Sequence, residues 1–522
     1  MTATTSDVEV ATTPDPGTEP DGPAGDQNAN IACWLADRAQ SDPTLPAIKQ
    51  GDIVMSYAAL DAASARFATV LAGRGVTAGD HVALIMPNVA YFPVAYYAIL
   101  RLGAVVVPMN PLLKANEIAF TWNDAGVKLA VVFAMFAAEA GKAATSTGCE
   151  VVVVTPGEFD TEVAAAEPTE GVATRTSSET AVILYTSGTT GQPKGAELSH
   201  ANLATNVRTD IETLMAVGPG DVLFGGLPLF HSFGQTCGLN AAIAAGACLT
   251  LLPKFDGAEA LRIVAADQVT VFLGVPTMYM GLLAVPDGES YDTSSLKLGA
   301  SGGASLPVEV LHAVEKKFGF TLLEGYGLSE TSPIASFNRP DRPTKPGSVG
   351  LPIRGVEFRL VDADDHDVAE GEIGEIVIRG ENVMTGYWQR PEATEEAMRG
   401  GWFHSGDLAT RDEDGFYFIV DRVKDLIIRN GFNVYPREVE EVLYAHDDVA
   451  EAAVFGVPDA EHGEEIAALV TLKDGGTVTE EELRDWVKEQ IAAYKYPRIV
   501  RFGTLPKGPT GKILKREITI ER

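Results

Sequence analysis

The stretch YTSGTTGQPKG, residues 185–195, follows directly on the apolar run AVIL at residues 181–184. A short β-rich run here opens into a loop with three glycines, four Ser or Thr hydroxyls and one lysine. Such a loop offers many backbone N–H donors with little steric cover, and nests of this kind bind anions. It is not a Walker loop, because Lys194 stands between Pro193 and Gly195. The stretch therefore predicts a polyphosphate site, although a loop of this composition is also typical of a plain linker.

The same string resembles the phosphate loop of the adenylate-forming superfamily, which contains acyl-CoA synthetases, peptide-synthetase adenylation domains and beetle luciferases. Further matching blocks follow in order: LPLFHSFG (227–234), SGGAS (301–305), EGYGLSE (324–330), GWFHSGDLA (401–409), DRVKDLIIRNGFNVYPREVE (421–440) and LPKGPTGKILKRE (505–517). The resemblance covers about residues 31–515. Within the superfamily, the chain most resembles a bacterial fatty-acid CoA ligase.

Composition limits the class of protein. A chain of 522 residues should form more than one domain. Its 40 Lys and Arg against 72 Asp and Glu give a net charge of −32, which disfavours nucleic acid as a partner. Four cysteines without zinc or disulfide spacing, and no basic residue before Arg38, lead us to expect a cytoplasmic location. The oligomeric state is left open, with a homodimer as one option.

Helical patterns such as 58–71 alternate with short apolar runs such as 82–85, which predicts parallel sheets covered by helices. The apolar stretch 91–109 is broken by Arg101, Gly103 and Pro108, so no transmembrane segment is expected. We expect an α/β fold: a large N-terminal domain of two parallel-type sheets with covering helices and a small β subdomain, and a small mobile α+β C-terminal domain. The expected boundaries are a disordered acidic tail (1–28), an adenylation domain (29–421) with its β-rich subdomain (347–421), a hinge (422–424) and the C-terminal domain (425–522).

The nucleotide site is assigned through the resemblance. Tyr326 offers an aromatic face, Asp407 a bidentate acceptor for the two ribose hydroxyls, and Glu330 with Thr186 hard oxygen ligands for Mg²⁺. From the residues alone, these segments could instead be tight turns, with Tyr326 in the core. The residues expected to bind ATP or AMP are Thr186, Ser187, Gly188, Thr189, Thr190, Gly191, Lys194, Gly302, Gly303, Ala304, Glu324, Gly325, Tyr326, Gly327, Ser329, Asp407, Arg422 and Lys512.

The resemblance also implies the catalytic and acyl-binding groups. Lys512 matches a catalytic lysine, and His231 matches a histidine that gates the acyl pocket; together with Thr186 and Glu330 they form the expected catalytic set. From composition alone, His231 could be a packed core residue and Lys512 part of a surface loop. The expected acyl pocket comprises His231, Phe233, Cys237, Ala241 and Gly303, and the expected hinge and coenzyme A path comprise Lys424 and Gly431.

These assignments imply an ATP-dependent ligase that activates a carboxylic acid as acyl-AMP and transfers the acyl group to coenzyme A. The absence of Asp, Lys and Arg from 232–247 favours a medium- or long-chain fatty acid and disfavours an amino acid. An aryl-CoA ligase, an acyl-AMP ligase that loads a carrier protein, and an inactive binding module are the alternatives. The expected partners are the acid, ATP, Mg²⁺ and coenzyme A.

Overall fold

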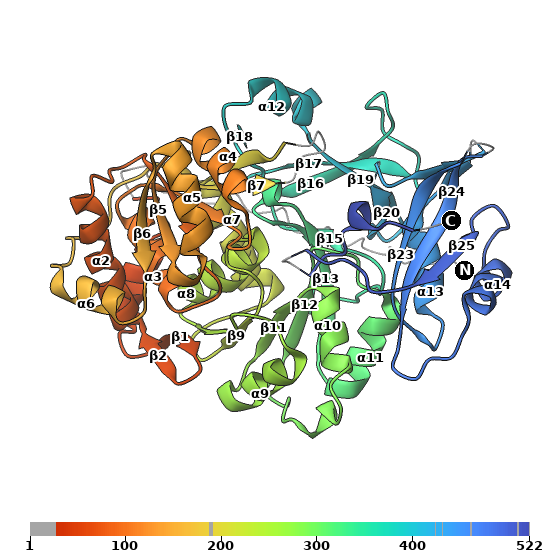
Figure 1. Ribbon diagram of the computed structural model, residues 1–522, viewed down its shortest axis with the longest axis horizontal. Helices are drawn as coiled ribbons and strands as arrows, with labels where there is room; N and C mark the ends of the chain where they lie inside the picture. The colour runs from red at the N-terminus through yellow and green to blue at the C-terminus, as the bar shows by residue number, and fades with distance from the viewer. Residues whose placement is uncertain are drawn as a thin grey trace, which may run out of the picture.

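The computed structural model describes residues 28–186, 192–422, 424–430, 432–459, 462–508 and 511–520. Residues 1–27 of the predicted tail, residues 187–191 of the glycine-rich loop, and Gly431 lie outside the described residues. The predicted α/β class is confirmed: a large N-terminal domain of parallel-type sheets precedes a smaller α+β C-terminal domain (Figure 1).

The first sheet has seven strands and a parallel centre. Its strands, in spatial order, are β18 (Gly386–Tyr387), β8 (Lys194–Ser199), β7 (Thr180–Thr186), β4 (Val105–Met109), β3 (His81–Ile85), β5 (Val127–Phe133) and β6 (Glu150–Val154). The strands from β7 to β6 run parallel, and the edge pairs β7–β8 and β8–β18 are antiparallel. Both faces of β3 are buried: Val82 and Leu84 face the main core, and Ala83 and Ile85 pack with Trp122 on the opposite face. Burial on both faces is expected of a parallel sheet.

The second sheet has nine strands. In spatial order they are β15 (Leu351–Pro352), β14 (Ile334–Phe337), β13 (Thr321–Gly327), β12 (Leu298–Ser301), β11 (Val271–Gly274), β9 (Val222–Gly225), β10 (Cys248–Leu251), β1 (Pro46–Gln50) and β2 (Ile53–Ser56). The strands from β13 to β1 are parallel. Figure 1 shows α9, α10 and α11 below this sheet.

Two smaller sheets complete the fold. The β-rich part is the antiparallel sheet β16 (Val356–Val361), β17 (Gly374–Gly380), β19 (Phe403–Arg411) and β20 (Tyr417–Arg422). The C-terminal sheet contains β22 (Phe432–Val434), β21 (Ile427–Arg429), β24 (Gly463–Leu472), β23 (Val449–Asp459) and β25 (Ile499–Phe502), drawn in blue in Figure 1.

The helices follow the apolar periodicity of the sequence, and Ser199 caps α7 as predicted by accepting a hydrogen bond from the Asn202 amide. Their bounds are α1 (Cys33–Ser41), α2 (Tyr57–Gly73), α3 (Tyr91–Arg101), α4 (Ala115–Ala125), α5 (Ala137–Thr147), α6 (Glu158–Ala165), α7 (His200–Thr209), α8 (Ala241–Ala245), α9 (Gly257–Asp267), α10 (Pro276–Leu283), α11 (Val308–Phe318), α12 (Pro391–Ala397), α13 (Pro436–Tyr444) and α14 (Glu480–Gln490). Two segments are π-helical: η2 (Asp210–Leu214) directly follows α7, and η3 (Phe233–Asn240) directly precedes α8. Short 3₁₀ turns are η1 (Ala134–Phe136), η4 (Gly288–Ser290), η5 (Ser329–Thr331), η6 (Arg399–Gly401) and η7 (Lys515–Glu517).

The stretch 91–109 forms the buried helix α3 and strand β4, as predicted. Within the described part of the chain, no helix has the length and apolar character needed to cross a membrane.

Candidate active site

Four of the predicted motifs lie at the carboxyl ends of parallel strands in the two large sheets. The glycine-rich loop follows β7, and the His231 block follows β9. The SGGAS segment begins at Ser301, the last residue of β12, and residues 324–327 are the last four of β13. Open α/β sheets bind ligands at this edge. The topology therefore brings together motifs that are far apart in the sequence.

The ribose candidate Asp407 is buried and held from two sides. The Tyr326 hydroxyl donates to Asp407 Oδ2 at 2.6 Å, and Arg422 Nε donates to Oδ1 at 3.0 Å. Asp407 and Arg422 face each other across β19 and β20. Since a carboxylate has about four acceptor positions, two remain for the vicinal hydroxyls of a ribose. The Asp407 charge is the main reason why the pKa of Arg422 is raised.

The metal candidate Glu330 is buried at η5, where three elements converge. Its Oε1 accepts hydrogen bonds from Thr186 Oγ1 at 3.2 Å and from the Tyr387 hydroxyl at 3.0 Å. The Lys194 ammonium lies 5.1 Å from the centre of the Tyr387 ring. Carboxylate and hydroxyl oxygens suit Mg²⁺, so this group fits the predicted ion. Sequence reasoning missed Tyr387, which β18 brings to the site by pairing with β8.

Cations gather around the same region. Partial burial, followed by repulsion from Arg422 and Lys194, lowers the pKa of Lys424. The Asp425 carboxylate opposes this shift, so Lys424 is surrounded by charges of both signs. Lys424, at the predicted hinge, therefore lies within electrostatic range of Arg422 and Lys194.

The loop that carries Lys512 contacts the N-terminal domain. Thr277 Oγ1, on α10, donates to the Gly511 carbonyl at 3.1 Å and docks this loop on the N-terminal domain. Position 511 favours glycine for two reasons: its φ of +79° is left-handed, and a Cβ there would lie 2.5 Å from the Thr277 hydroxyl. Lys512 is solvent-accessible, yet enclosure by protein and then the Arg422 charge lower its pKa to about 8.

His231 is a neutral acceptor in this arrangement. Burial, and secondarily the Lys512 charge, lower the pKa of His231 to about 4. Its Nδ1 accepts a weak hydrogen bond from the Phe233 amide at 3.4 Å, which leaves the ring proton on Nε2. His231 and Lys512 are thus electrostatic neighbours.

The SGGAS segment connects the nucleotide and acyl candidates. A Cβ on Gly302 would lie 3.3 Å from the Phe233 ring and 3.5 Å from the Gly325 carbonyl. Gly303 has a left-handed φ of +77°. Glu324 is tied to this segment, because its Oε1 accepts from the Leu306 amide at 2.9 Å. Burial raises the pKa of Glu324 to about 7, against the opposing Arg437 charge.

The remaining predicted residues are placed on these same elements. Gly325 and Gly327 lie on β13, Ser329 on η5, Ala304 in the turn after β12, and Cys237 and Ala241 on η3 and α8. The described residues do not include Gly431, nor Ser187, Gly188, Thr189, Thr190 and Gly191 of the glycine-rich loop.

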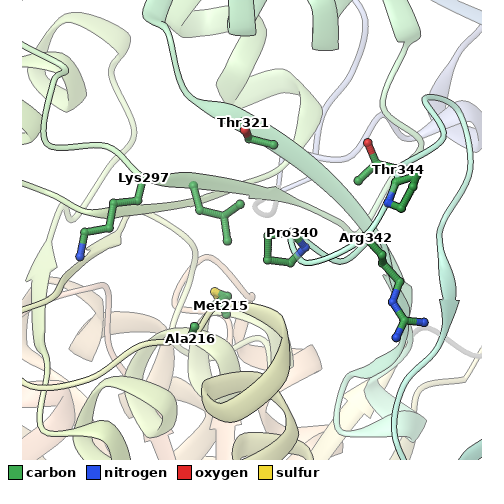
Figure 2. Close-up of a pocket in the computed structure, with 9 residues that line it drawn as sticks. Met215, Ala216, Lys297, Thr321, Pro340, Arg342 and Thr344 are labelled. Atoms are coloured by element: carbon green, nitrogen blue, oxygen red, sulfur yellow. The ribbon is translucent and has the colours of Figure 1, made fainter.

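A separate cavity of about 500 Å³ lies at the opposite edge of the second sheet. It is lined by residues that include Leu298 and Thr321, the first residues of β12 and β13 (Figure 2). Lys297 and Arg342 extend from opposite sides of this cavity and point away from each other. Lys297 is also paired with Asp221 at 2.8 Å. We therefore place the active site at the carboxyl edge.

Comparison with known proteins identifies the family of this chain. The family model for AMP-binding enzymes matches residues 35–388, and the model for the AMP-binding enzyme C-terminal domain matches residues 438–512. This chain belongs to the AMP-binding enzymes. The resemblance to the adenylate-forming superfamily is thereby confirmed.

Individual AMP-binding enzymes are similar over nearly the whole chain. A long-chain-fatty-acid–CoA ligase of Bacillus subtilis is 36% identical over 530 residues, 95% of each chain. A feruloyl-CoA synthase of an Amycolatopsis species is 38% identical over 500 residues, 94% of this chain and 99% of that protein. The crystal structure of ATP-bound MatB from Rhodopseudomonas palustris has a TM-score of 0.87 and 36% identity, covering 94% of this chain and 98% of its own.

Proposed function

We propose that this AMP-binding enzyme is an AMP-forming acid–CoA ligase whose substrate is a medium- or long-chain fatty acid. The observation that carries the proposal is the convergence of Asp407, Arg422 and Lys512 at one edge of the fold. These groups suit the attack of a carboxylic acid on the α-phosphate of ATP. Asp407 offers a carboxylate to the ribose, Lys512 offers a cation, and His231 is neutral.

In the first half-reaction, the acid carboxylate displaces pyrophosphate and forms acyl-AMP. Asp407 would hold the ribose hydroxyls, and Lys512 would stabilise the negative charge that develops at the α-phosphate. Neutral His231 would border the acid carboxylate without adding charge. Mg²⁺, held by Glu330 with Thr186 nearby, would neutralise phosphate charge.

In the second half-reaction, the thiol of coenzyme A attacks the acyl carbon and AMP leaves. We propose that the C-terminal domain (425–522) turns about the hinge at 422–424, withdrawing Lys512 and bringing Gly431 to the site. Support for two states comes from the hydrogen bond that Thr277 donates to the Gly511 carbonyl, a contact of the kind that a domain rotation can break.

The fatty-acid assignment is supported by the small, apolar wall after His231. Cys237, Ala241 and Ala242 are fully buried on η3 and α8. The similar feruloyl-CoA synthase makes an aryl acid the second candidate.

A panel of fatty and aryl acids assayed for CoA-dependent AMP formation separates the two candidates. We expect kcat/KM to rise from acetate through medium-chain toward long-chain fatty acids, by up to about fourfold per buried methylene. A panel in which coumarate or benzoate exceeds every fatty acid would reject the fatty-acid assignment.

A further inference from the structure

Asp210 is a fully buried acid that the mechanism above does not use. It has no exposed surface, and among the described residues its carboxyl group has only the Cys237 thiol, a weak hydrogen-bonding group, as a partner. The large majority of buried side-chain polar atoms in native proteins have a regular hydrogen-bond partner. An exception of this kind calls for a ligand, a water molecule or a functional explanation.

The neighbour of this carboxyl group is the Cys237 thiol, a predicted wall of the acyl pocket. Asp210 begins the π-helical segment η2, and Cys237 lies in the π-helical segment η3. π-Helical turns are rare and often occur at functional sites. Two π-helical segments therefore meet at the acid and the thiol.

The carboxyl group is in its neutral form. No cation is paired with it in the described part of the chain, and burial raises its pKa well above the ordinary value. An isolated buried carboxylate is too costly to persist, so the group keeps its proton. A neutral carboxyl group donates one hydrogen bond and accepts others.

Further unpaired oxygens lie beside this pair in the chain. Thr209 and Thr236, the sequence neighbours of Asp210 and Cys237, each have a buried hydroxyl without a partner among the described residues. The expectation of an apolar pocket rested on the absence of Asp, Lys and Arg from residues 232–247. Asp210 lies outside that range, but the contact between η2 and η3 places it beside Cys237. Cys237 lies six positions after His231, inside the π-helical segment η3 that begins at Phe233. The polar group thus lies deeper than the carboxylate end of the proposed pocket.

We propose that Asp210 is a specificity-determining residue that hydrogen-bonds an oxygen at the far end of the acid substrate. The substrate class is then a carboxylic acid with an apolar body and a hydroxyl, carbonyl or ether oxygen at its distal end. This inference rests on the proposed function and narrows its substrate.

The test compares matched acids on the full-length enzyme. Hexanoate, octanoate and decanoate are assayed against their ω-hydroxy counterparts, and cinnamate against 4-hydroxycinnamate, by CoA-dependent AMP formation. We expect at least one chain length at which the ω-hydroxy acid has the higher kcat/KM, and the aryl pair tests whether an aromatic body serves instead. A preference for the unsubstituted acid in every pair would overturn the inference.

Substitutions of Asp210 test whether its carboxyl group causes the preference for the ω-hydroxy acid. Asp210→Leu should lower the preference for the ω-hydroxy acid by about tenfold, mainly by raising the KM of that acid. Asp210→Asn retains hydrogen-bonding atoms and should keep most of the preference. Glu212→Leu is the matched control, because Glu212 lies on the same segment but is exposed and paired with Arg354 at 2.9 Å. An unchanged preference in Asp210→Leu, or an equal loss in Glu212→Leu, contradicts the assignment.

The experiments distinguish failure of the proposed ligase function from failure of the proposed role of Asp210. If no acid supports AMP formation, the proposed function fails and the inference falls with it. If acids are activated without any hydroxyl preference, only the inference fails. Should Asp210→Leu not give a cooperative thermal transition, the wild-type pairs and Asp210→Asn decide the outcome.

Discussion

Tyr387→Phe should lower the apparent affinity of the enzyme for Mg²⁺ in adenylation and leave the KM of the acid unchanged. The substitution keeps the ring beneath Lys194 and removes only the hydroxyl that donates to Glu330 Oε1 at 3.0 Å. A hydrogen bond to a charged group contributes about 1.5–3 kcal/mol, and partial exposure of Tyr387 places this one at the lower end. The half-saturating Mg²⁺ concentration should therefore rise about tenfold.

The assay is acid-dependent ATP–pyrophosphate exchange across a Mg²⁺ series at fixed ATP. Tyr91→Phe is the matched control, because the Tyr91 hydroxyl donates to the Asp160 carboxylate at the same 3.0 Å but lies on α3. That variant should keep the wild-type Mg²⁺ dependence. If Tyr387→Phe keeps it too, or changes only the KM of the acid, Tyr387 does not act through Glu330.

Lys512→Ala should reduce adenylation by about 10² to 10³ and spare thioester formation from supplied acyl-AMP; equal losses in both would refute the two-state assignment. Because Lys512 acts in its charged form and its pKa is lowered to about 8, adenylation should decline as pH rises through about 8, and Lys512→Arg should move that decline upward if the lysine causes it. Gly431→Trp and Lys424→Pro should keep pyrophosphate exchange and lose CoA ester formation, and normal ester formation in both would remove the support for domain rotation. Ala241→Trp should shift the optimum toward shorter acids, and an unchanged chain-length profile would place Ala241 outside the pocket.

The fold was predictable because its signals are local and repeat along the chain. The apolar run at 82–85 became β3, and the helical pattern at 58–71 lies within α2. The motif residues Asp407 and Arg422 were predictable as site members through the resemblance. That they bond directly was not predictable, since this depends on the register of β19 against β20.

The residues that sequence reasoning missed act through tertiary packing. Tyr387 reaches Glu330 only because β18 pairs with β8, and nothing near position 387 indicates a metal site. Asp210 had a weak signal: it continues, at spacings of seven and three, the helix face that buries Leu203 and Val207. An acidic residue here stands at a position where the helix periodicity predicts a buried apolar side chain. Such departures from the expected pattern occur at functional sites.

Acid-dependent ATP–pyrophosphate exchange in the absence of coenzyme A tests the central claim most directly. The account predicts that the wild-type enzyme incorporates labelled pyrophosphate into ATP when a fatty acid is present, and that Lys512→Ala does so about 10² to 10³ times more slowly. Exchange that requires coenzyme A, or that no carboxylic acid supports, would contradict formation of an acyl-adenylate at this site.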